Sequence, residues 1–291
     1  MTKRNVLRGM GWIPDVPSIH DYHTAHPEVR PMLAKTRLTA ALAAPALPAR
    51  VDLRPHFPPV EDQQQLGACT ANAAAGLVGY FEEKALGRAI DVSRLFIYKA
   101  TRNLTGTRGD SGAYLRTTME ALAVFGAPPE SYWPYDGSPE ASNKRFDAEP
   151  SAFCYAFARS FEALKYVRLD PVNTAPDQVL ANIRAYLAAG LPSLFGFPAY
   201  DEYMNAGVDG KVPFPSPTSQ LLGGHANVAV GYDDHLAVGP ETGALLVRNS
   251  WGTGWGMEGY GWLSYKYVTQ GLAVDWWTVI KQSWVDTGQF A

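Results

Sequence analysis

The spacing of apolar residues predicts three helices in the first two thirds of the chain. Segment 69–88 repeats apolar positions at helical spacing, contains no proline and reaches Gly87 near its end. Two more helices are expected at about 114–124 and 176–189. The third has an acidic residue in its first turn and Gly190 after its end, which are typical start and stop signals.

After Leu191 the pattern changes to short apolar runs between Gly and Pro clusters, which is typical of strands. The runs lie at about 192–197, 225–232, 243–251, 260–265 and 275–280. A helix-rich part followed by a β-rich part predicts an α+β protein with two lobes, about 51–165 and 166–291. The groove between two such lobes is the natural ligand site.

Residues 1–50 differ from the rest, with early prolines and then the Ala-rich, Pro-punctuated stretch 39–50, TAALAAPALPAR. This composition is typical of a pendant arm joined by a cleavable connector. The remaining residues, 51–291, are expected to form the folded domain.

Composition excludes several classes of protein. The chain has 291 residues, 46% of them hydrophobic, and a net charge of -3 without basic blocks, so neither a nucleic-acid binder nor a polybasic membrane anchor is expected. No apolar run approaches the ~20 residues of a membrane helix, and the first residues lack the apolar stretch of a secretory signal. A cytoplasmic location and export by a leaderless route both stay open.

The two cysteines, Cys69 and Cys154, are too few for a disulfide framework. We interpret Cys154 as a small buried thiol in an apolar segment, although a single bridge between the two cysteines is formally possible. His20, His23 and His26 recur every third residue, but no set of further ligands completes a metal site, so none is expected.

Cys69 is the first candidate nucleophile, because it opens the strongest predicted helix. The positive end of the helix dipole favours the thiolate there, although an inert buried cysteine is the ordinary alternative. Gln63 lies six positions earlier in VEDQQQLGAC. Its side-chain amide and the backbone N–H of Cys69 could hold a developing oxyanion, whereas a glutamine run alone is usually a polar loop.

His225 and Asn249 complete the candidate set. His225 in GGHANVAVGYDD should begin a strand and could take the proton of a facing thiol, and Asn249 in LLVRNSWGTGWG could orient its ring. Trp251 and Trp255 could shield that hydrogen bond from water. His235 is a weaker candidate, since it follows two aspartates in what is expected to be a solvated turn.

These segments together resemble the papain family of cysteine peptidases. VEDQQQLGAC resembles its Gln-to-Cys segment, and GGHANVAVGYDD and LLVRNSWGTGWG resemble its histidine and asparagine segments. The resemblance covers about Val51 to the C-terminus. It implies a papain-like two-lobed fold, with a helical lobe, an antiparallel β-barrel-like lobe and the active-site cleft between them. It also implies no cofactor and no metal.

The resemblance further implies substrate-binding residues. Backbone groups of Gly112 and Ala113 would pair with an extended peptide. A side-chain pocket would be lined by Tyr114, Gly196, Gly223 and Asp275, in which the acid could accept a basic side chain. Gly224, next to the histidine, and Trp251, beside the asparagine, complete this expected set.

The sequence also departs from the family pattern. Leu66 and Asp110 stand where relatives have two bridged cysteines, and Thr70 stands where a tryptophan normally follows the nucleophile. Gly224 replaces the polar residue that commonly precedes the histidine. Loss of both bridge members together implies that the bridge is absent rather than broken.

The function implied is that of a cysteine endopeptidase that acts on peptides or proteins through a thioester. Residues 1–50 resemble the short arm of bacterial members, so a zymogen with its own prosegment in the cleft is expected. Two alternatives stay open at this point. A catalytically weak homologue would bind peptides without cleaving them, and an acyl transferase would use the same Cys–His pair with an amine acceptor.

Overall fold

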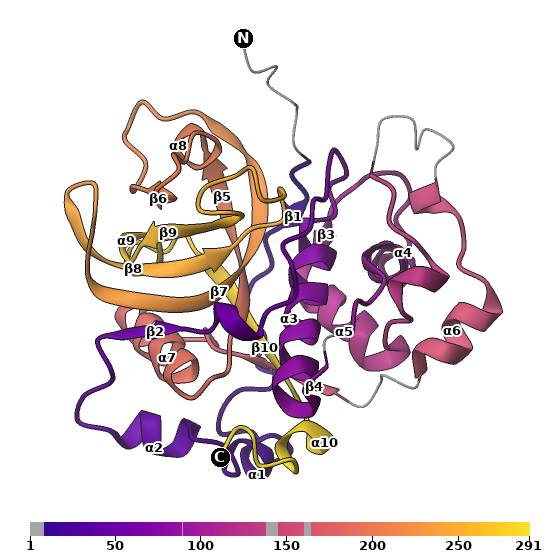
Figure 1. The fold of residues 1–291 in the computed structure, drawn as a ribbon, viewed down its shortest axis with the longest axis horizontal. Coiled ribbons are helices and arrows are strands. Elements are labelled where there is room, and N and C mark those ends of the chain that lie inside the picture. Colours follow the sequence, from indigo (N-terminus) through magenta and orange to yellow (C-terminus); the bar gives the residue numbers. More distant parts are fainter. Residues whose placement is uncertain (1–8, 89, 138–144, 160–163) are drawn as a thin grey trace.

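The computed structural model describes residues 9–88, 90–137, 145–159 and 164–291 as two lobes side by side, one mainly helical and one mainly β (Figure 1). The α+β class and the two-lobed arrangement are therefore confirmed. None of the helices in these ranges is long and apolar enough to span a bilayer. The helices are α1 (Arg30–Leu33), α2 (Leu38–Ala43), α3 (Cys69–Leu86), α4 (Arg94–Thr105), α5 (Leu115–Phe125), α6 (Ala152–Ala158), α7 (Pro176–Ala188), α8 (Asp201–Met204), α9 (Lys266–Thr269) and α10 (Gln282–Val285).

All three predicted helices are present, as α3, α5 and α7, with bounds within two residues of those expected. Helix α3 ends at Gly87, whose φ of 67° is the left-handed conformation that glycine adopts most readily. The helix is buried on nearly all sides because it lies between the lobes (Figure 1). The many small residues of α3 permit this close packing. At Gly76, for example, an added Cβ atom would lie only 3.0 Å from Nε of Arg248.

The described strands form a two-stranded pair, β1–β3, and an eight-stranded sheet in the order β4-β10-β5-β7-β8-β9-β6, with β2 added on β7. Their bounds are β1 (Trp12–Ile13), β2 (Arg50–Asp52), β3 (Ala113–Tyr114), β4 (Leu164–Arg168), β5 (Ser193–Tyr200), β6 (Lys211–Val212), β7 (Leu221–Val238), β8 (Glu241–Arg248), β9 (Tyr260–Ser264) and β10 (Val274–Lys281). The expected turn at His235 is wrong. β7 continues through it, because Asp233 and Ala237 pair with β8 on either side of it.

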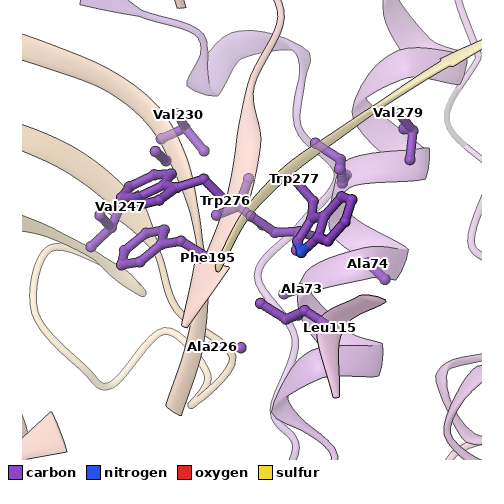
Figure 2. Close-up of a cluster of buried hydrophobic side chains, with 14 of the residues drawn as sticks. Ala73, Ala74, Leu115, Phe195, Ala226, Val230, Val247, Trp276, Trp277 and Val279 are labelled. Atoms are coloured by element: carbon purple, nitrogen blue, oxygen red, sulfur yellow. The ribbon is translucent and has the colours of Figure 1, made fainter. Parts of the chain in front are cut away.

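Strand β10 joins the cores of the two lobes. Successive side chains of a strand point to opposite faces, and Trp276 and Trp277 are both fully buried on different sides. Trp276 stacks on Phe195 at 4.1 Å between ring centroids inside the β lobe, whereas Trp277 points toward α3 near Ala74 (Figure 2). One strand thus ties the sheet to the central helix.

The N-terminal fifty residues are not a pendant arm throughout. Val29, Leu33 and Leu38, in and beside α1 and α2, are at most 3% exposed and belong to the main hydrophobic core. Helix α1 lies beneath the domain next to α10, and α2 lies below α7 (Figure 1). Between the two helices, Arg37 N–H donates to the carbonyl of Phe290 at 2.8 Å. The composition of residues 1–50, with its prolines and alanines, did not predict that these three side chains would join the core.

Replacement of Leu33 by alanine should therefore lower the free energy of unfolding by about 2–4 kcal/mol, the usual result of opening a cavity in a core. The matched control is Leu42→Ala on α2, whose side chain is 46% exposed and should change stability by less than about 0.5 kcal/mol. Urea unfolding of the full chain measures both. Equal stability of the two variants would show that this part of the arm is not core.

Candidate active site

Cys69 is the first residue of α3 and is fully buried. Backbone groups of Gly11 in the N-terminal arm and Ala226 in β7 lie near its thiol and lower its pKa, as do those of Cys69 and Thr70 at the start of the helix. Ala226 directly follows His225, so the fold brings the candidate nucleophile of the helical lobe close to the segment of the β lobe that carries the candidate base. The two segments are separated by more than 150 positions in the sequence.

The His225 imidazole is held from one side by Asn249. Its Nε2 lies 2.8 Å from Asn249 Oδ1, which also accepts the backbone N–H of Ser250 at 2.8 Å. Because Nε2 donates to the amide oxygen, Nδ1 is the ring atom that remains to accept a proton, and it has no partner among the described residues. The Trp251 ring covers the imidazole at 4.7 Å between centroids, and Trp255 packs edge-on against Trp251.

Gln63 has its amide fixed by bonds that sequence analysis did not anticipate. Its Oε1 accepts the Ser250 hydroxyl, which orients Nε2 toward the carbonyls of Leu66 at 2.8 Å and Gly9 at 2.9 Å. The Tyr135 hydroxyl donates to its backbone carbonyl at 2.9 Å. Ser250 adjoins Asn249 in the motif and could have been suspected, whereas nothing in the sequence around Tyr135 pointed to this contact.

The backbone of the predicted substrate strand is already paired with the arm. β1 runs parallel to β3, with Trp12 opposite Ala113, and Ala113 N–H donates to the Gly11 carbonyl at 2.7 Å. Gly112 has a φ of 73°, and a Cβ there would lie 2.4 Å from the same carbonyl. A Cβ at Gly224 would lie 2.2 Å from the Trp12 carbonyl oxygen. The glycine that stands at 224 in place of the polar residue of the family pattern therefore leaves room for the arm.

The other expected pocket residues surround the same arm segment. Ile13 is paired opposite Tyr114, and a Cβ at Gly223 would lie 2.9 Å from that of Met10. The Trp12 ring lies against Gly196, and its Nε1 donates to Asp275 Oδ2 at 3.1 Å. Every predicted substrate-binding residue except Trp251 therefore contacts residues 10–13, while Trp251 contacts His225.

Burial sets the ionisation of Cys69 and His225. It raises the pKa of the Cys69 thiol to about 11, despite the nearby backbone groups of Gly11 and Ala226, which lower it. It lowers the pKa of His225 to about 4, against the opposing effect of the Asn249 hydrogen bond. The expectation that the helix N-terminus lowers the thiol pKa is wrong for this covered state, because desolvation outweighs the dipole. Thiol and imidazole are both neutral at pH 7.

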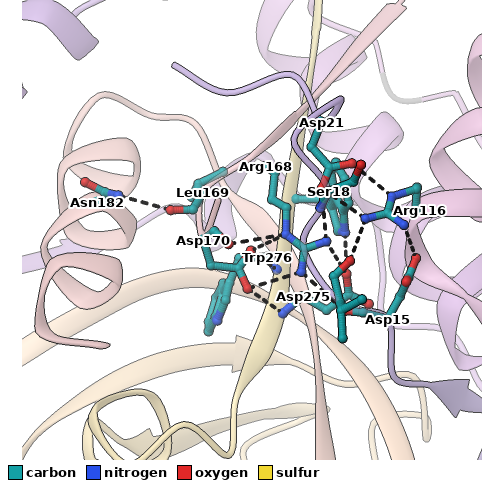
Figure 3. A network of polar contacts seen from close by, with 12 residues as sticks. Asp15, Ser18, Asp21, Arg116, Arg168, Leu169, Asp170, Asn182, Asp275 and Trp276 are labelled. Atoms are coloured by element: carbon teal, nitrogen blue, oxygen red, sulfur yellow. Dashed lines mark hydrogen bonds and ion pairs between the residues drawn. The ribbon is translucent and has the colours of Figure 1, made fainter. Parts of the chain in front are cut away.

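Ion pairs hold the arm beyond the cleft (Figure 3). Arg116 on α5 contacts the carboxylates of Asp15 at 2.5 Å and Asp21 at 3.0 Å. Arg168, at the end of β4, is fully buried and pairs with Asp21 at 3.5 Å, Asp170 at 2.9 Å and Asp275 at 3.4 Å. Arg168 therefore contacts both Asp21 of the arm and Asp275, the residue that accepts the Trp12 N–H.

A hydrogen-bonded clamp is built on Asp110, one of the two positions at which the resemblance implies a bridged cysteine. Both carboxylate oxygens of Asp110 accept the backbone N–H of Gly67, at 2.9 and 3.0 Å, and Oδ1 also accepts the Tyr98 hydroxyl at 2.6 Å. Tyr98 in turn accepts the N–H of Gly112 at 3.1 Å. The clamp ties the segment before Cys69 to the strand that pairs with the arm. Cys69 and Cys154 are both free thiols, so no bridge joins them.

Comparisons with known proteins identify the family of the chain. Xylellain, a cysteine protease from Xylella fastidiosa, superposes with a TM-score of 0.78 at 33% identity, over 97% of this chain and 99% of that one. A peptidase C1-like protein, L477, of Acanthamoeba polyphaga mimivirus is 32% identical over 96% of this chain and 89% of its own length. Digestive procathepsin L 3 of Tenebrio molitor, 20% identical, shares the fold with a TM-score of 0.60 over 94% of this chain and 75% of that one. The model of the papain family cysteine proteases matches residues 47–283, and the chain belongs to that family.

Proposed function

We propose that the protein is a cysteine endopeptidase made as a zymogen, in which residues 9–13 block the cleft. A papain-family cysteine peptidase hydrolyses peptide bonds, and here Cys69 is the proposed nucleophile. Its sulfur forms a bond to the peptide carbonyl carbon while His225 takes the thiol proton. His225 then protonates the leaving amine as the C–N bond breaks, and water, with His225 as base, hydrolyses the thioester.

The observation that carries the proposal is the Gln63 amide, which Ser250 orients toward a peptide carbonyl of the arm. Its Nε2 lies 2.9 Å from the Gly9 oxygen, within the range required of an oxyanion donor. A substrate carbonyl in that position would be polarised by Gln63 and by the Cys69 N–H. Asn249 keeps the imidazole oriented, and Trp251 excludes water from that hydrogen bond.

The inhibitory role of the arm is supported by what it offers to the thiol. A backbone group of Gly11 lies beside the sulfur, in the space that a substrate would occupy. The arm also excludes water and leaves the thiol and imidazole uncharged, so neither the nucleophile nor the hydrolytic water is available. The ion pairs of Asp15 and Asp21 with Arg116 then keep the segment in place.

Deletion of residues 1–14 should convert an inactive full chain into an active peptidase, because it removes the cleft segment but keeps Asp15, Asp21 and the buried helices α1 and α2. Cys69→Ala in this background should abolish hydrolysis. Gln63→Ala should lower kcat by about 10²–10³ with little change in KM, as expected for a lost oxyanion donor. Steady-state hydrolysis of a fluorogenic peptide library measures all of these.

The matched control is Gln65→Ala, two positions along the same loop, whose side chain is not bonded to Gln63 or Cys69. It should leave kcat nearly unchanged. Full activity of the undeleted chain would contradict the inhibitory role of the arm. Undiminished hydrolysis by the Cys69→Ala variant would contradict the peptidase assignment, and product analysis with an added amine separates hydrolysis from acyl transfer.

Acidification should favour release of the arm. The covered His225 has a pKa of about 4 through burial, whereas an exposed imidazole titrates near its ordinary value of 6.5. Between these values the open form binds the proton and the covered form does not, so the stability of the covered form falls as pH falls below 6.5. The linkage predicts a roughly twentyfold larger open population at pH 5 than at pH 7.

Hydrogen exchange of the Ala113 amide, which donates to Gly11, reports this opening once intrinsic rates are corrected for pH. The His225→Asn variant removes the titrating group and should lose the pH dependence while exchange remains measurable. Equal pH dependence in the variant and the wild type would show that another group controls release.

A further inference from the structure

We propose that the pocket filled by Trp12 gives the released enzyme a preference for tryptophan in its substrates, with Asp275 as the residue that recognises the indole N–H. The inference rests on the proposed function, since it assumes that substrate replaces residues 9–13 in the cleft. It replaces the expectation that the acid in this pocket accepts a basic side chain.

The shape of the pocket fits a flat fused ring. A Cβ at Gly196 on β5 would lie 1.9 Å from Trp12 Cε2 and 2.1 Å from its Nε1, so the indole occupies the space that any other residue type at 196 would fill. The side chain is almost completely enclosed, with Trp12 only 7% exposed. Such an enclosed slot favours a large planar side chain, because burial of aromatic area dominates binding energetics.

The Asp275 carboxylate is held with one oxygen facing the pocket. Its Oδ1 accepts Trp277 Nε1 at 2.7 Å and lies 3.4 Å from Arg168, while Oδ2 accepts the Trp12 N–H. Its backbone has a φ of 61°, rare for a residue other than glycine, at an irregularity where the pairing of β10 with β5 shifts register. The Asp170 carboxylate accepts the N–H of Asp275 at 2.8 Å and supports this conformation.

The Asp275 carboxylate does not need a basic side chain from the substrate. Arg168 is fully buried and already pairs with Oδ1 of Asp275. An uncharged N–H donor satisfies the remaining oxygen, Oδ2, and an indole loses less hydration than a cation on entering the enclosed slot. Phenylalanine would fill the ring space but leave the buried oxygen without a donor, which costs roughly tenfold or more in binding.

The test uses the chain lacking residues 1–14 and a peptide library in which each of four positions before the cleaved bond is fixed in turn. At one of these positions tryptophan should give the highest kcat/KM. It should exceed 1-methyltryptophan, which lacks only the N–H, by about tenfold or more, and lysine and arginine by at least as much. Equal rates for tryptophan and 1-methyltryptophan, or a preference for arginine, would overturn the proposal and leave the peptidase function intact.

A pocket variant provides the matching change in the protein. Gly196→Ala should lower kcat/KM for the tryptophan substrate at least tenfold while sparing alanine or valine at the same position. Gly254→Ala is the control, because a Cβ there meets nothing within 4 Å. Thermal unfolding of both variants shows whether either has lost stability. An unchanged tryptophan preference in a folded Gly196→Ala variant contradicts the proposal.

A second readout does not need catalysis. In the full chain, the rate at which iodoacetamide alkylates Cys69 reports how often the arm leaves the cleft. Trp12→Phe should raise this rate about tenfold, and Trp12→Arg should raise it further. If no peptide is hydrolysed, the proposed function fails, but this order of labelling rates still decides whether the pocket prefers an indole. A slower rate for Trp12→Arg than for the wild type would overturn the inference.

Discussion

The hydrogen bonds between Gln63 and Ser250 set the geometry on which the active site depends. Ser250 follows β8 in the β lobe, and Gln63 precedes α3 in the helical lobe. The Gln63 N–H donates to the Ser250 carbonyl at 2.7 Å, and the Ser250 hydroxyl donates to Oε1 of Gln63. Because Asn249 is the neighbour of Ser250, the same turn orients the His225 imidazole through one residue and Gln63, the proposed oxyanion donor, through the next. A shift between the lobes would disturb both groups together.

The N-terminal fifty residues combine two roles that the sequence does not separate. Residues 9–13 lie in the cleft, whereas Val29, Leu33 and Leu38 complete the hydrophobic core. The ion pairs of Asp15 and Asp21 stand between these two parts and connect both to Arg116. The cleft segment buries one large side chain, Trp12, and is otherwise attached by hydrogen bonds and ion pairs, whereas the segment after it is attached by several core residues. Release of the first part need not disturb the second.

The α+β fold class could be predicted from the sequence, because helix periodicity and short apolar runs are local signals. Short motifs likewise nominated Cys69, His225 and Asn249 as candidates. Properties that arise only when distant segments meet could not be predicted. The turn expected at His235 was overruled by pairing of β7 with β8, and Asp234 there binds Arg184 of α7. The direction of the Cys69 pKa shift depends on burial beneath the arm, which no local pattern contains. Tyr135 is the same kind of case, since its contact with Gln63 spans 72 positions.

The Asp110 clamp has a consequence for the chemical surroundings in which the enzyme can work. A thiol nucleophile must stay reduced, and a structural disulfide beside it would be exposed to the same reductant. Here a carboxylate, a phenol and two backbone N–H groups hold the loop before Cys69, the proposed nucleophile. None of these groups exchanges electrons with thiols. A reductant that keeps the Cys69 thiol reduced therefore leaves these contacts, and the rigidity they give to the loop, unchanged.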